Sequence, residues 1–334
     1  MVRLIYPYPT TALQFSLCDQ FSIFLLLISI PILVLSIIHI DSDIHTPTNI
    51  SSTIPTPYSL PTKVYGSPSL FITIIGQLFR KENESIDPNR IIQDGKRVAE
   101  NPYMDLYVVN DHLPVDIDWW KQESKPVYEY VRERLNTTLS SKVIVTFVPP
   151  RTGNCAPRGT TFHEQQSIIV IFANQQTDHG QVLATLAHEL GHVFIQNKYE
   201  NLSDVALTEG LATWAAGDYW ESWKGVSFNS GVKDFIDSGT YLPLFSNFDM
   251  TRAYDNNSSK CIMNRDILLT ETASFIDYLS LTYGVEKLSN LFNIKQPEVV
   301  NNQRVVYPPD FKEVFGLELN QLEYMWLKSI NHPD

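Results

Sequence analysis

The run from Ala184 to Phe194, "ATLAHELGHVF", constrains the fold most, because it is almost wholly apolar yet contains two histidines and a glutamate. On a helix, residues four apart lie on one face, so His188 and His192 project side by side. Burying ionisable side chains is costly unless a partner holds them. We therefore expect a deeply buried helix whose two imidazoles share a partner, and a metal ion is the usual one.

The glutamate completes an H-E-x-x-H pattern. Glu189 directly follows the first histidine, where a general base beside a metal-bound water would stand. The pattern alone is a weak signal, since roughly one chain in a hundred of this length would contain it by chance. The alternative is a pair of core histidines whose ring nitrogens are hydrogen-bonded to backbone carbonyls. The helix that follows favours the metal site.

A third ligand is needed, because catalytic zinc takes three protein ligands and keeps one position for water. Glu209 stands in a second predicted helix, residues 203–221, which Ser203 or Asp204 can cap. Residues 196–202 give the chain room to reverse between the two helices. Taken alone, Glu209 would more often be a solvated helix residue. In a helix whose small residues permit close packing, it is predicted to complete a His2Glu set. Those small residues are Gly210, Ala212, Ala215 and Ala216.

An apolar segment near the N-terminus predicts a membrane anchor. Residues 21–40, "FSIFLLLISIPILVLSIIHI", contain no Asp, Glu, Lys or Arg, and as a helix they would span about 30 Å, the thickness of the hydrocarbon core. A secretory signal has a shorter apolar core and a small-residue cleavage site, so an atypical cleaved signal is the alternative. Arg3 before the span, and Asp41 and Asp43 after it, favour a short cytoplasmic N-terminus (residues 1–20) and an external body.

The rest of the chain divides into a tether, a connecting segment and a body. Residues 41–69 are rich in Ser, Thr and Pro and predict a semi-extended tether. Residues 70–103 connect it to the body, and their apolar start, "LFITIIGQLFR", is expected to pack on the core, with docking on the membrane surface as the alternative. The body, residues 104–334, has strands first and helices after, which favours an α+β fold. Expected strands are 104–110, 142–150 and 166–175; expected helices are 116–136, with Pro126 as a kink or boundary, 179–199, 203–221, 266–283 and 319–330.

Charge and cysteine content narrow the possible functions. The net charge is −12 and no block of Lys or Arg occurs, which argues against a nucleic-acid-binding surface. Cys18 precedes the apolar span, whereas Cys155 and Cys261 lie in the body. In an external domain these two cysteines either form one disulfide or remain buried thiols.

Beyond the motif, the sequence resembles the gluzincin zinc metallopeptidases, in particular the compact peptidase-MA-like group of membrane-attached or secreted proteins. "HELGH" followed by "TEGLATWAAG" carries the resemblance, which extends from about residue 104 to residue 330. "ETASFIDYLSLTYGVEKLSNLF" and "FKEVFGLELNQLEYMWLKSI" look like the helices that follow the metal site in that group. The resemblance implies a zincin-like fold, in which a strand-bearing N-terminal lobe packs on a helical C-terminal lobe with Zn²⁺ between them.

The resemblance also assigns roles to individual residues. His188, His192 and Glu209 would bind zinc, and Glu189 would be the catalytic base. The strand at residues 167–174 would be the edge strand, which pairs with an extended substrate by β-augmentation.

One position departs from the family pattern. In the aminopeptidase branch, the tyrosine that stabilises the oxyanion begins the helix that matches "LTETASFIDYL", and this chain has Leu269 there. Tyr219, Tyr254 or Tyr278 can substitute, although each is also a candidate for a simple packing aromatic. Losing one oxyanion donor costs roughly 10²–10³ in rate, so the expected efficiency falls while zinc chemistry survives. The departure also argues against an aminopeptidase.

The expected activity is zinc-dependent hydrolysis of peptide or protein substrates outside the membrane, by an endopeptidase. The alternative is a membrane-tethered binding or scaffolding protein with the same fold and little or no turnover. The intact ligand set argues against this alternative, whereas Leu269 favours it. The cleavage preference and the oligomeric state do not follow from the sequence.

Overall fold

A computed structural model describes residues 64–65, 86–199, 202, 204–292, 298–300, 303–305 and 309–331. These residues belong to one compact unit, Thr56–Asp334. The predicted membrane span and nearly all of the tether lie outside the described residues, as does the apolar start of the connecting segment. Within the described ranges, no helix combines the length and the apolar character needed to cross a membrane.

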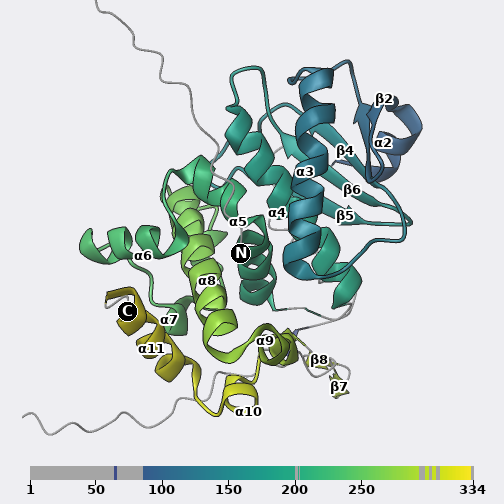
Figure 1. The fold of residues 1–334 in the computed structure, drawn as a ribbon. Helices are drawn as coiled ribbons and strands as arrows, with labels where there is room; N and C mark the ends of the chain where they lie inside the picture. The colour runs from purple at the N-terminus through teal and green to yellow at the C-terminus, as the bar shows by residue number, and fades with distance from the viewer. Residues whose placement is uncertain are drawn as a thin grey trace, which may run out of the picture. The chain divides into compact units, whose positions relative to one another are not determined.

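A five-stranded mixed sheet occupies the N-terminal part of this unit (Figure 1). Its central strands β3, β4 and β6 run parallel, and β2 and β5 pair antiparallel with them to give the order β2-β3-β4-β6-β5. The bounds are β2 (Lys96–Glu100), β3 (Met104–Val108), β4 (Val143–Val148), β5 (Gly159–His163) and β6 (Ser167–Phe172).

The central strands are buried on both faces. Val145 and Ile169 face the core formed with α3 (Ile117–Leu135) and α4 (His179–Lys198). Ile144 and Ile168 face the opposite way and pack with Ile91 of α2 (Pro88–Asp94). Because both faces are covered, β4 and β6 are mostly apolar rather than alternating, with Thr146 as a buried polar residue in β4.

Helices form the rest of the unit. α5 (Val205–Lys224) contacts α4, and α8 (Cys261–Tyr283) contacts α5.

A small second sheet has the order β1-β8-β7, so Val64–Tyr65, within the predicted tether, forms a strand. The expected mixed α+β fold is thus confirmed. The other elements are α6 (Phe228–Asp237), α7 (Leu244–Asn247), the 3₁₀ helix η2 (Thr251–Ala253), α9 (Val285–Phe292), β7 (Glu298–Val300), β8 (Gln303–Val305), α10 (Phe311–Phe315) and α11 (Leu319–Asn331).

The expected helices are present, one of the two caps expected for α5 is confirmed, and differences occur at the start of α8 and at Pro126. α5 is capped by Asp204, whose carboxylate accepts a hydrogen bond from the Leu207 amide. α8 begins at Cys261, earlier than expected. Pro126 is not a boundary, because α3 continues through it. The missing proline N–H costs a hydrogen bond, but the stripe that buries Trp120, Val127 and Val131 outweighs that cost.

The prediction that residues 167–174 form the edge strand of the sheet was wrong. β6 lies inside the sheet, between β4 and β5, and among the described strands β5 is the one at that edge. Side chains on both faces of β6 are buried, which suits an interior strand. The short sequence "GTTFH" of β5 instead carries small and polar residues.

Close helix packing brings α4 to α5. A Cβ atom on Gly191 would lie 2.8 Å from the Cα atom of Ala212, so only a glycine allows the two backbones to approach this closely. Similarly, a Cβ atom on Gly210 would lie 2.2 Å from the Thr272 Cγ2 atom of α8. Gly210 and Ala212, two of the small residues noted in the sequence, therefore lie at helix contacts.

Cys155 and Cys261 form a disulfide, with their Cα atoms 5.2 Å apart. It joins the loop before β5 to the first residue of α8. The two body cysteines are therefore not free thiols.

Candidate metal centre

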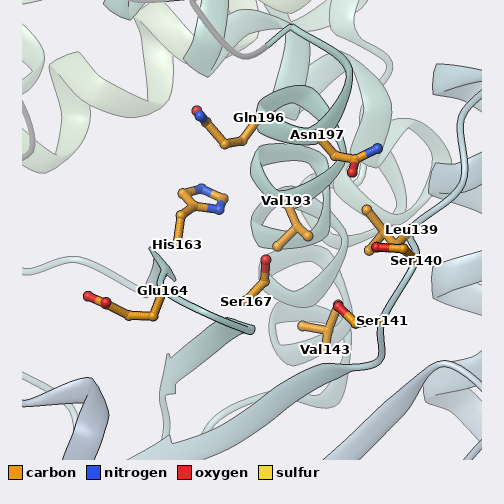
Figure 2. A pocket seen from close by; sticks show the side chains of 10 residues that line it. All are labelled: Leu139, Ser140, Ser141, Val143, His163, Glu164, Ser167, Val193, Gln196 and Asn197. Atoms are coloured by element: carbon orange, nitrogen blue, oxygen red, sulfur yellow. The ribbon is translucent and has the colours of Figure 1, made fainter.

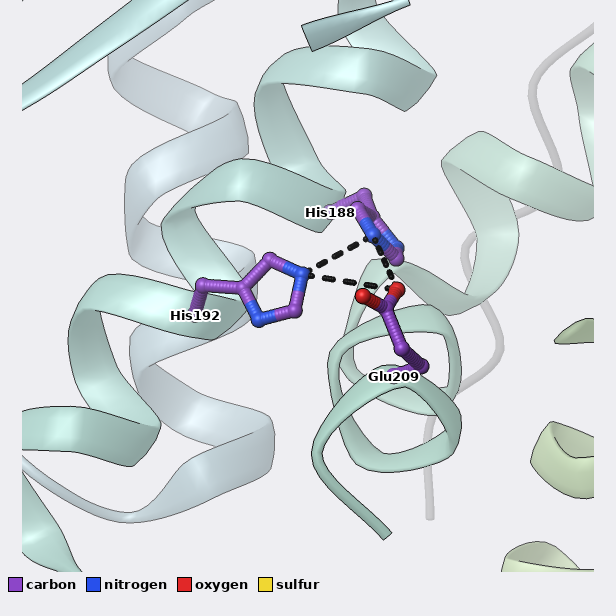
Figure 3. Close-up of side chains that lie close together, drawn as sticks. All are labelled: His188, His192 and Glu209. Atoms are coloured by element: carbon purple, nitrogen blue, oxygen red, sulfur yellow. Dashed lines mark hydrogen bonds and ion pairs between the residues drawn. The ribbon is translucent and has the colours of Figure 1, made fainter. Parts of the chain in front are cut away.

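His188, His192 and Glu209 meet where α4 packs on α5 (Figure 3). His188 Nε2 lies 3.1 Å from His192 Nε2 and 3.3 Å from Glu209 Oε2, and His192 Nε2 lies 3.6 Å from the same oxygen. Donor atoms bound at about 2.0–2.1 Å in a tetrahedral site lie about 3.3–3.4 Å from one another. The three donor atoms therefore have the separations of three corners of such a site. Among the described residues, they are the group that can hold a metal ion.

The charge state of Glu209 suits a ligand. Burial raises the pKa of its carboxyl, but the charges of and hydrogen bonds from His192 and His188 outweigh burial and hold the pKa well below its usual value. Burial likewise lowers the pKa of His192, and the Glu209 carboxylate reverses this effect and raises it. Glu209 is thus a carboxylate held between two imidazoles. Two other acidic residues of this region, Asp204 at the start of α5 and Asp218 within it, are not in the group.

A threonine orients the first histidine. Thr213 Oγ1 donates a hydrogen bond to the Glu209 backbone carbonyl at 2.8 Å and lies 3.2 Å from His188 Nδ1. Because the single hydroxyl proton is used on the carbonyl, the contact with His188 requires an Nδ1–H donor. This tautomer leaves the Nε2 lone pair of His188 facing His192 and Glu209, as a metal ligand requires.

Glu189, which is not one of the three donor residues, is hydrogen-bonded to β5. It is 5% exposed, and its Oε2 accepts a hydrogen bond of 2.7 Å from Thr161 Oγ1. A Cβ atom on Gly159 would lie 2.6 Å from Glu189 Oε1, so the glycine leaves space for that oxygen. Since strand residues two apart share a face, Gly159, Thr161 and His163 all face α4.

Tyr254, just after η2, lies beside the ligands. Burial raises the pKa of Tyr254 well above its ordinary value, and the Glu209 carboxylate raises it further through its charge and a hydrogen bond; the charge of Glu189 adds to the shift. Tyr219 instead packs edge-on against Tyr130, with ring centroids 5.4 Å apart. Tyr278, on α8, interacts with Thr282 and Tyr283. Of the three tyrosines considered from the sequence, Tyr254 is the one beside the centre.

A pocket of about 200 Å³ is lined by residues of β4, β5, β6, α4 and the loops between them, and none of the three donor residues is among them (Figure 2). His163 is on its wall, and the pKa of His163 is lowered to about 4, first by desolvation and then by the nearby His192, so its ring is neutral at pH 7. Gln196, also on the wall, stands one helical turn after His192. Figure 2 shows the Glu164 side chain directed away from the other residues. The lining residues are Leu139, Ser140, Ser141, Val143, His163, Glu164, Ser167, Val193, Gln196 and Asn197.

Several residues around the centre were missed from the sequence. Thr213 had a usable signal, because it follows Glu209 by one helical turn and must share its face. Thr161, His163 and Gly159 had none, because β5 itself was not expected. The structure does bring together three of the expected residues, His188, His192 and Glu209, whereas the Glu189 carboxylate is hydrogen-bonded to Thr161 of β5.

No protein-family model matches this sequence, and no curated protein matches it. Function is therefore inferred from the geometry of the centre and from the residues around it.

Proposed function

We propose that this chain is a zinc-dependent peptidase of the gluzincin type. The observation that carries the proposal is the set of three donor atoms at tetrahedral separations on α4 and α5. Two imidazoles and one carboxylate are a ligand set typical of catalytic zinc, which keeps a fourth position open. The neighbouring Glu189, which is not one of the three donors, supports hydrolysis rather than a purely structural site.

Each nearby residue has a role in this chemistry. Bound zinc would polarise the substrate carbonyl and lower the pKa of water. Glu189 would take a proton from the attacking water and deliver it to the leaving amine. Thr161 fixes one oxygen of Glu189 by its hydrogen bond, and the space beside Gly159 leaves room for the other.

An extended peptide would pair with the outer edge of β5, which no described strand covers. If it pairs antiparallel, its N-terminal side lies near His163 and its C-terminal side near Gly159. The peptide would then run along α4, across the metal ligands. The pocket beside His163 is smaller than the 300–1,000 Å³ of typical ligand sites and fits one side chain on the N-terminal side of the cleaved bond. On this basis we propose that the fold is zincin-like.

Tyr254 is the best candidate for stabilising the oxyanion. Its hydroxyl is next to Glu209, so it is near the place where charge develops on the carbonyl oxygen. The position that holds the tyrosine in aminopeptidases is occupied here by Leu269, which is 4% exposed and packs in the core. We infer an endopeptidase that uses a tyrosine from a different element.

We further propose that the peptidase is anchored by residues 21–40 and faces the extracytoplasmic side. The Cys155–Cys261 disulfide supports this location, because disulfides persist in oxidising compartments and are rare in the cytosol.

The test compares metal content with turnover in the full chain. We expect about one zinc per chain and hydrolysis of an unfolded protein that a chelator abolishes. Glu189→Gln should keep the zinc and lose activity by about 10²–10⁴, because glutamine cannot accept the proton. His192→Ala should lose zinc and activity together. If Glu189→Gln is as active as the parent, the mechanism is wrong. A parent that binds zinc and hydrolyses nothing would instead favour the scaffolding protein.

A further inference from the structure

The disulfide lies beside the backbone of Ala253, the residue that precedes Tyr254. The Sγ atoms of Cys261 and Cys155 lie 3.2 and 3.9 Å from the backbone carbonyl oxygen of Ala253, the residue before Tyr254. Ala253 is fully buried, so this contact is enclosed by protein. The Cys261 sulfur therefore contacts the peptide unit that precedes the tyrosine, and the Cys155 sulfur lies just beyond contact distance.

The loop before β5 is held to α8 by further contacts. The Arg265 guanidinium donates hydrogen bonds to the carbonyl oxygens of Cys155 and Ala156, at 3.3 and 2.8 Å. Arg158 forms a bidentate pair with Asp266, at 2.7 and 2.9 Å. Because these contacts do not need the disulfide, its loss should leave β5 in place against α8. The contact with the Ala253 carbonyl, in contrast, is made by the Cys261 sulfur itself.

We propose that the Cys155–Cys261 disulfide is a positioning device for Tyr254, so that reducing it lowers turnover while the metal stays bound. This inference rests on the proposed peptidase function and adds redox control to it. The metal ligands are on α4 and α5, and neither cysteine belongs to those helices. Reduction should therefore affect the tyrosine selectively. Cys155 and Cys261 would act through Tyr254 and would not touch the substrate.

The redox step can be carried out with a phosphine reductant. The phosphine attacks one sulfur and is oxidised to the phosphine oxide, while water supplies the oxygen and two protons; the disulfide becomes two thiols. A phosphine is preferable to a dithiol, because a dithiol also chelates zinc. The sequence has one further cysteine, Cys18, so no second intrachain disulfide can be broken.

The experiment measures kcat, KM and zinc content of the full chain before and after reduction. We expect kcat to fall by at least about 10-fold, and at most by the 10²–10³ of a lost oxyanion donor, with little change in KM or zinc. The Cys155→Ala/Cys261→Ala double variant should behave like the reduced protein without any reductant. Hydrogen exchange should rise in residues 249–258 and stay low in α4 and α5.

Two tyrosine variants distinguish positioning from a general loss of stability. In Tyr254→Phe, reduction should lower kcat no further, because both changes remove the same interaction. In Tyr219→Phe, the matched control, reduction should lower kcat as in the parent. A fall in kcat of the same size in Tyr254→Phe would overturn the proposal, and so would unchanged exchange in residues 249–258. If the oxidised parent shows no hydrolysis, the peptidase function fails, and hydrogen exchange alone still decides whether the disulfide holds this segment.

Discussion

At the scale of single residues, the centre depends on groups that touch the ligands rather than the metal. Thr213 is the clearest case, because its one hydroxyl proton goes to the Glu209 carbonyl and its lone pairs face His188. One side chain thereby links both metal-binding helices. It also selects the histidine tautomer, which the spacing of H-E-x-x-H alone does not determine.

Thr213→Val tests this role. Valine keeps the shape but cannot accept from His188 Nδ1, so we expect the dissociation constant for zinc to rise about 10–100-fold. Thr208→Val is a matched control, because Thr208 is also on α5 and donates to the carbonyl four residues earlier, that of Asp204. Competition with a chromogenic chelator measures both variants. Equal zinc affinities for the two would show that Thr213 does not orient His188.

At the scale of elements, the contact between α4 and α5 sets the distance from the histidines to Glu209. Gly191→Ala would put a methyl group 2.8 Å from the Ala212 Cα atom, where backbone must move. We expect a loss of about 1–3 kcal/mol in the free energy of unfolding, together with weaker zinc binding as the donor atoms separate.

Gly231→Ala, on α6, is the control for that change. Its added Cβ atom would meet only side-chain atoms, the nearest 3.2 Å away. Alanine also favours a helix over glycine, so stability should change little or rise. Urea unfolding and zinc titration compare the two. Unchanged zinc affinity in Gly191→Ala would mean that the helix spacing does not control the centre.

α8 contains a buried acid that opposes folding at neutral pH. Glu271 is fully buried, accepts from the Leu242 amide and has no described partner for Oε2. Burial, and then the charge of Glu323, raise the pKa of Glu271 to about 9 despite the Leu242 hydrogen bond. The folded state thus keeps the proton, while the unfolded chain releases it above about pH 4.5. Below pH 4.5 both states keep the proton, so Glu271 does not reduce the free energy of unfolding. As the pH rises from 4.5 towards 9, only the unfolded chain ionises, and the free energy of unfolding falls progressively.

Glu271→Gln should therefore stabilise the protein at pH 7, by about 1–3 kcal/mol, since glutamine mimics the protonated acid. The gain should disappear near pH 4.5 and grow towards pH 9. Glu323→Gln is the contrasting variant, because this carboxylate accepts from the Tyr241 hydroxyl and from the amides of Leu244 and Phe245, and it should destabilise. Chemical denaturation across this pH range provides the measurement. A gain that is independent of pH would contradict the buried, protonated Glu271.

The sequence predicted a helix or strand correctly where the apolar pattern of the element's own residues determines which of its faces is buried. The 3.6-residue period located α3, α4, α5 and α11, and Asp116 and Asp204 marked two helix starts. β5 was missed because "GTTFH" has neither an apolar run nor clear alternation, and its pairing with β6 stabilises it. The wrong edge followed from this omission. Helix spacing predicts the three ligands, whereas Tyr254 reaches Glu209 only through tertiary packing.

At the scale of the whole molecule, the centre lies where the sheet edge meets the helices. β5 supplies Thr161 and Gly159 to Glu189, while α4 and α5 supply the donor atoms. The turn after η2 supplies Tyr254. Because these segments are distant in sequence, the site requires the folded unit. A metal ion at this centre would be held by two helices that already pack through Gly191, so removing it should leave the fold intact.

The remaining expectation at this scale is the membrane anchor. Residues 21–40 lack charged residues, so we expect the mature protein to retain them and to sediment with membranes after alkaline carbonate extraction. Two arginines near the middle of the span, Leu26→Arg and Leu33→Arg, should each cost about 2.5–3.5 kcal/mol of insertion and release the protein. Leu26→Ala with Leu33→Ala is the matched control and should stay with membranes. N-terminal sequencing decides against the anchor if the mature chain begins after Ile40, because the apolar run would then be a cleaved signal.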